Sequence, residues 1–221
     1  MKRNQNSIFS TRKLVVMAAL IAIQIVTARY LSVQTPTLRI SFETVPLALA
    51  GMWLGPAGGM LVALVSDILG TFVSGYGVWF APITLGPVCF AALCGLSSKY
   101  IFKSELSETR DSWKVIVTTL LAGAVNALLI GTVTVTLYNV IFTDAQYTFV
   151  ELTKACVDGS LFELVTRSFE NGKFFALLGA SFVERLISKP VVIVICSLLV
   201  ALIHRTVYRP VIGRIVRANK K

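Results

Sequence analysis

The sequence predicts an all-α polytopic membrane protein with six transmembrane helices and with both termini in the cytoplasm. Of its 221 residues 55% are hydrophobic and only 14% are charged, whereas a typical soluble domain carries about 25% charged residues. Charges are absent from three long runs, 44–66, 68–98 and 115–143. A water-facing surface would interrupt such runs every few residues. These observations argue against a soluble enzyme and against a disordered chain, which needs low hydrophobicity.

Six apolar segments are candidate spans. Five of them reach or come close to the length of about 20 residues that a crossing requires, and 43–54 is shorter. The first follows a basic flank like that of a signal peptide, but we expect it to remain as a helix because it leads into more membrane sequence. Gly55-Pro56 and Gly75-Tyr76-Gly77 break the next apolar run, since Gly ends helices and Pro begins them. The expected helices are 13–31, 43–54, 56–73, 82–101, 115–141 and 174–203.

The basic residues predict the orientation of these helices. The N-terminus, the loop after the fourth helix and the tail 205–221 hold four, four and six basic residues, 14 of the 21 Lys and Arg. The positive-inside rule makes this side cytoplasmic, and 143–173 becomes an extracellular loop. Helix 43–54 is short, so a re-entrant hairpin with 56–73 is an alternative, but it would place the basic tail outside. Lipid headgroups explain that tail without nucleic acid.

Ionisable residues within or beside the spans are the candidates for binding a solute. Such a group costs at least about 2.5 kcal/mol at the bilayer centre, so it usually faces protein, water or a ligand. The candidates are Arg39 in the extended segment 32–42, Glu43 and Asp67, and Arg185 and Lys189, which lie on one helix face. An outward-open pocket for an anionic solute would use these groups. Internal pairing, for example of Asp67 with Arg39, would explain them equally well.

Aromatic side chains in the loop after the third helix suit a flat heterocycle, although an interfacial aromatic belt has the same composition. They are Tyr76, Trp79 and Phe80. We expect no enzyme, cofactor or metal site: there is no phosphate-binding Gly-rich loop, no His-Glu-x-x-His, and His204 is the only histidine.

Several strings resemble the substrate-binding S components of energy-coupling factor (ECF) vitamin importers, particularly their folate branch. These strings are Ser32–Phe42 (SVQTPTLRISF), Val45–Gly51 (VPLALAG), Leu54–Gly59 (LGPAGG) and Ser66–Gly70 (SDILG). Ala18 and Ala22 resemble the alanine motif through which the family docks on its partner. The resemblance implies a six-helix protein of a bacterial plasma membrane that captures a vitamin. It further implies a transmembrane coupling protein (the T component) and two cytoplasmic ATPases as partners.

Folate suits the residues found independently, and we hypothesise how its two ends would bind. The pterin would stack on the aromatic loop and donate N–H groups to Asp67 or Glu43. The glutamate tail would meet Arg39, Arg185 or Lys189. The loop 73–82, Glu43 and the length of 143–173 depart from the family pattern, which leaves pantothenate or another small anionic vitamin as an alternative. A structural or regulatory subunit and a stand-alone ion-coupled carrier are alternatives of other classes.

Overall fold

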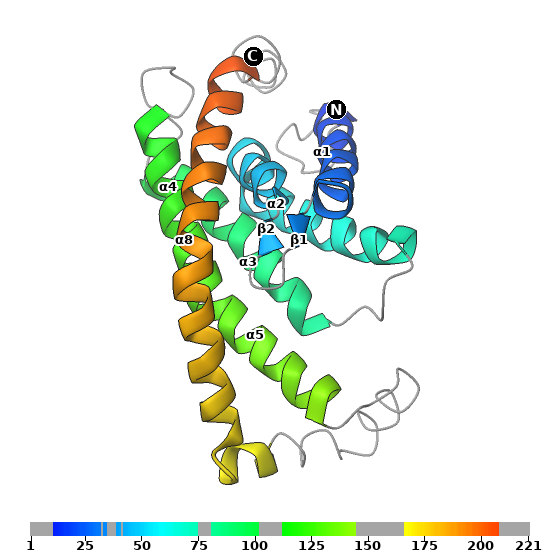
Figure 1. The fold of residues 1–221 in the computed structure, drawn as a ribbon. Helices are drawn as coiled ribbons and strands as arrows, with labels where there is room; N and C mark the ends of the chain where they lie inside the picture. The colour runs from blue at the N-terminus through cyan, green and yellow to red at the C-terminus, as the bar shows by residue number, and fades with distance from the viewer. Residues whose placement is uncertain are drawn as a thin grey trace.

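A computed structural model describes residues 11–31, 33–34, 39–40, 42–74, 81–101, 112–144 and 166–207 (Figure 1). The long helices are α1 (Thr11–Arg29), α2 (Thr44–Ser74), α3 (Ala81–Leu96), α4 (Ser112–Val125), α5 (Gly131–Tyr138) and α8 (Lys173–Val207). Three π-helical segments, η1 (Ser97–Ile101), η4 (Asn126–Ile130) and η5 (Asn139–Asp144), continue α3, α4 and α5 in turn. The short strands β1 (Val33–Gln34) and β2 (Arg39–Ile40) pair antiparallel.

The predicted class, a helical membrane protein, is confirmed. Within the described residues, four helical stretches are long and apolar enough to cross a bilayer, and Lys13–Ala28 is a shorter apolar helix. The four are Thr44–Val73, Pro82–Tyr100, Ser112–Ile141 and Lys173–Val207. The start of α1 and the end of α8 lie at the same end of the molecule (Figure 1).

A sharp bend at Gly55 divides α2 in two. The backbone there has φ 84° and ψ 174°, a conformation that is essentially restricted to glycine. The next residue is Pro56, which lacks the N–H that would continue the first half of the helix. The bend stands at the Gly55-Pro56 pair where the sequence predicts a break.

The two halves of α2 fold back against each other at glycines. A methyl group placed on Gly59 would lie 2.7 Å from the Cα of Gly51, whereas residues eight apart in a straight helix are separated by about 12 Å. Gly95 of α3 packs into the same crossing, because a methyl group there would lie 2.6 Å from the nitrogen of Pro56. The first half, residues 44–54, is about 16 Å long, which is too short to cross a bilayer alone.

The core forms where α2 packs against α1, α3 and α8. Its most buried members include Leu47, Val62, Phe90 and Val200, and Val115 joins them from α4. Side chains of α1 enter this core through Met17 and Leu20. The β1–β2 pair follows α1 and places Gln34 opposite Arg39, so the predicted extended segment begins and ends in paired strands.

Candidate functional site

Arg185 lies about 18 Å along α8 from its start at Lys173. Its side chain is half-buried, and its Nη1 donates a hydrogen bond of 3.3 Å to the backbone oxygen of Ala127 in η4. The absence of a side chain at Gly131 makes this position possible, since a Cβ there would collide with Nη1 of Arg185. The embedded cation is therefore held between α8 and the junction of η4 with α5.

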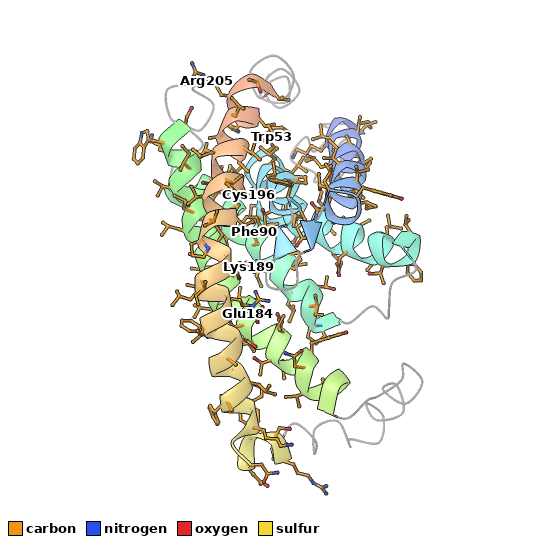
Figure 2. The ribbon with its side chains drawn as sticks, viewed as in Figure 1. Trp53, Phe90, Glu184, Lys189, Cys196 and Arg205 are labelled. Carbon is orange, nitrogen blue, oxygen red and sulfur yellow. The ribbon has the colours of Figure 1, made fainter. Side chains whose placement is uncertain are left out.

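Lys189 lies one turn further along α8, in a different polar neighbourhood. Figure 2 shows it between Glu184 and Cys196 on the helix. Lys189 and Glu43 both act electrostatically on Cys196, so the start of α2 approaches this part of α8. Glu43 and Lys189 are both half-buried, and both already interact with the protein.

Asp67 lies in the second half of α2 and is bound by α3. The hydroxyl of Thr84 donates a hydrogen bond of 2.5 Å to Oδ2 of Asp67. Thr84 also lines a cavity of about 440 Å³ between α2 and α3. The cavity is open to the outside, because Met60, Leu64 and Leu85 of its lining are exposed. The rest of the cavity lining is apolar: Ala57, Met60, Leu61, Leu64, Leu85 and Val88.

Asp67 and Asn126 of η4 meet α3 on opposite sides. Thr84, which binds Asp67, and Gly86, which faces η4, are two residues apart and so differ by about 200° around the helix. Both positions lie within about 8 Å of the start of α3 at Ala81. The pairing of Asp67 with Arg39 that the sequence leaves open stays untested, because the side chain of Arg39 lies outside the described residues.

The remaining predicted binding residues lie wholly or partly outside the description. Arg39 is described only by its backbone in β2. The aromatic residues of the predicted loop, Tyr76, Trp79 and Phe80, lie outside the described residues. Their roles stay predictions.

Ala18 and Ala22 are exposed on α1. Val15, Ile23 and Val26 are exposed beside them, at 65%, 51% and 49%, whereas Met17 and Leu20 turn into the core. The outer face of α1 is therefore small and apolar, which suits close approach by another helix.

Sequence reasoning missed Asn126, an uncharged polar residue inside the apolar run 115–143. Its Oδ1 is buried without a hydrogen-bond donor and faces Gly86, where a Cβ would lie 3.6 Å away. The sequence could have indicated Asn126, because an unpaired polar group is costly inside a membrane and an amide in an apolar run therefore needs a partner. Sequence reasoning also missed the bond of 3.0 Å from Nε1 of Trp53 to Nδ1 of His204, which ties α2 to the end of α8.

Comparison with known proteins matches residues 12–200 to a family model described as "ECF transporter, substrate-specific component". Two curated relatives are both called folate transporter FolT. The one from Clostridium novyi is 34% identical over 97 residues, which cover 44% of this chain and 55% of the relative. The one from Leuconostoc mesenteroides is 33% identical over 87 residues, which cover 39% of this chain and 46% of the relative.

The chain thus spans about half the length of the curated relatives it matches. A solved structure, FolT bound with folic acid, is similar with a TM-score of 0.48 and 22% identity. The similarity covers 78% of this chain and 92% of that chain.

Proposed function

This chain belongs to the family of ECF transporter substrate-specific components, and from this premise we propose that it binds folate for import into a bacterial cell. The family consists of transporter components, so the prediction that the chain is not an enzyme is confirmed. The family match over residues 12–200 carries the proposal. The names of the two relatives favour folate over other vitamins.

The embedded cations support an anionic ligand. Arg185 is fixed by one hydrogen bond from Nη1 to Ala127, and a guanidinium has five N–H donors with a geometry that matches a carboxylate. In our proposal Arg185, Lys189 and Arg39 attract the glutamate carboxylates of folate. Asp67 is assigned to the N–H edge of the pterin, as is Glu43.

An elongated ligand fits the spacing of these groups better than a compact one. Thr84 holds Asp67 on one side of α3, and Gly86 faces Asn126 of η4 on the other. Arg185 is bound to the next residue of η4, Ala127. Because Thr84 and Gly86 are both close to the start of α3, a ligand that lies across this end of the helix can reach both sides. The predicted aromatic residues Tyr76, Trp79 and Phe80 directly precede this end and would stack on the pterin.

We assign the partners by family. A T component and two cytoplasmic ATPases would supply the energy, and the exposed alanines of α1 would dock on the T component. Six membrane helices with cytoplasmic termini in the plasma membrane remain part of this proposal. Helix 43–54 is too short to cross the bilayer alone and packs back on the second half of α2.

Calorimetric titration of the detergent-purified protein tests the ligand. We expect folic acid to bind and pantothenate not to bind. Arg185→Met should weaken folic acid binding at least about tenfold, because a charge-assisted hydrogen bond contributes about 1.5–3 kcal/mol. Arg205→Met is the matched control, since Arg205 is exposed near the end of the same helix. Absence of folic acid binding to the wild-type protein refutes the proposal. If the protein binds pantothenate in preference to folic acid, pantothenate is the ligand in place of folate.

Co-purification with a T component and its ATPases tests the docking face. Ala18→Trp and Ala22→Trp should abolish the complex, because an indole prevents close helix approach. Leu121→Trp places the same side chain on α4, at a residue that is 61% exposed, and should leave the complex intact. A complex that survives both alanine substitutions refutes the assignment of this face.

A further inference from the structure

The π-helical segment η4 presents backbone and side-chain acceptors to α8 and α3. The N–H of Gly131 bonds to the oxygen of Asn126, the five-residue spacing of a π turn, and such turns are frequent at functional sites. The next oxygen, that of Ala127, accepts a hydrogen bond from Nη1 of Arg185 and one of 3.4 Å from the hydroxyl of Thr132. Arg185 is thereby fixed beside the residue that follows Asn126.

Arg185 keeps donors for a ligand. Among the described residues, Arg185 donates a hydrogen bond to Ala127, and this bond uses one nitrogen of the guanidinium. The neighbouring carboxylate, Glu184, is exposed and projects about 100° away around the helix. A ligand carboxylate can therefore pair with the other N–H groups of Arg185.

Asn126 adds an acceptor without a donor. Its Oδ1 is buried and has no hydrogen-bond partner, which is costly in an apolar interior. The atom faces α3 at Gly86, the position that lacks a side chain. A ligand group that bonds to Oδ1 would lie where a side chain of residue 86 would otherwise stand.

We propose that Arg185 and Asn126 together bind the N-acyl amino acid end of the ligand. Arg185 takes the carboxylate, and Oδ1 of Asn126 accepts the amide N–H that lies close to it. This inference rests on the proposed function and deepens it. Folate ends in an N-acyl glutamate, and pantothenate is an N-acyl β-alanine, so both candidate vitamins carry this pair of groups. Binding pairs the acceptor that is left unpaired in the free protein.

Asn126→Leu separates a ligand-binding role from a packing role. Leucine has a similar volume and removes the unpaired acceptor, so the free protein should unfold at a temperature higher by about 2–4 °C. Affinity for folic acid should fall about tenfold, the equivalent of one lost hydrogen bond. Affinity for pteroic acid, which is folic acid without the glutamate and its amide N–H, should not fall.

Thr118→Val is the matched control. The hydroxyl of Thr118 is also buried without a partner, and it lies on α4 two turns before Asn126. Its removal should raise the unfolding temperature similarly and leave the affinity for both ligands unchanged. Asn126→Asp is a second test that retains the shape of the side chain, and its negative charge beside the ligand carboxylate should weaken folic acid binding more than leucine does.

If the wild-type protein binds folic acid, the proposed function stands, and any of three results then refutes the inference alone. They are an unchanged folic acid affinity in Asn126→Leu, an equal loss for folic acid and pteroic acid, and a loss in Thr118→Val as large as that in Asn126→Leu. If the wild-type protein binds pantothenate instead, only the assignment of folate is refuted. Titration of the same variants with pantothenate then tests the inference. A protein that binds neither vitamin refutes both.

Discussion

The crossing of the two halves of α2 predicts that Gly59→Ala destabilises the protein. A methyl group on Gly59 would lie 2.7 Å from the Cα and 3.0 Å from the nitrogen of Gly51, and 3.3 Å from the Cβ of Ala91. The first two atoms belong to the backbone, which cannot rotate away as a side chain can. The two half-helices must therefore move apart to admit the methyl group.

The size of the effect follows from these distances. Carbon atoms attract one another best at about 3.5–4.0 Å, so the half-helices must separate by roughly 1 Å. Overpacking of this kind costs about 1–3 kcal/mol. Alanine in place of glycine in a helix interior gains about 0.8–1.0 kcal/mol, which offsets part of that cost.

Gly179→Ala is the control that isolates the packing cost. Gly179 lies inside α8, and a methyl group there would meet nothing within 4 Å. Its substitution should show the gain in helix propensity alone. The difference in free energy of unfolding between the two variants should therefore be about 1–3 kcal/mol, with Gly59→Ala the less stable.

Thermal unfolding in detergent micelles, followed by far-ultraviolet circular dichroism, measures this difference. For a chain of this length 1 kcal/mol corresponds to about 2–4 °C in the unfolding midpoint. Equal midpoints for Gly59→Ala and Gly179→Ala would show that the two halves of α2 do not touch at Gly51, which refutes the fold-back.

The same unfolding assay tests three further predictions. Gly55→Ala and Gly55→Leu should each lower the free energy of unfolding by roughly 1–3 kcal/mol. The loss arises from the backbone conformation, because a Cβ at this position meets nothing within 4 Å. A loss that grows with the size of the side chain contradicts this explanation. His204→Leu should lower the free energy of unfolding by about 1–3 kcal/mol, because it removes the acceptor of the Trp53 N–H. The double variant His204→Leu, Trp53→Phe should recover part of this loss, since it also removes the donor. Thr84→Val should cost about 1.5–3 kcal/mol through its bond to Asp67, and an unchanged midpoint would show that the bond contributes nothing.

Helix breaks could be predicted from the sequence because their causes are local. The φ of 84° at Gly55 and the missing N–H of Pro56 act on adjacent residues. The fold-back of the two half-helices on Gly51 and Gly59 could not be predicted in the same way. It depends on which helix faces meet, and a helix rich in small residues is compatible with several crossings.

Ionisable residues could be singled out as candidates because their burial is costly wherever they point. The structure places Asp67 and Arg185 in contact with the protein as that cost requires. Their partners could not be named from the sequence. Thr84 is one of several threonines in apolar runs, and the oxygen of Ala127 is a backbone atom whose availability depends on the π turn of η4.

Uncharged polar residues escape sequence analysis for a different physical reason. Hydroxyl groups in a helix can donate to the backbone oxygen one turn earlier, as Thr71 does to Asp67 and Thr136 does to Thr132. Such residues need no ligand and no neighbouring helix, so a polar residue in an apolar run carries little information by itself. The side-chain oxygen of Asn126 is an acceptor, and the backbone N–H groups around it are already used in the helix. It therefore requires a donor from another element or from a ligand, which makes asparagine more informative than threonine in the spans of a membrane protein.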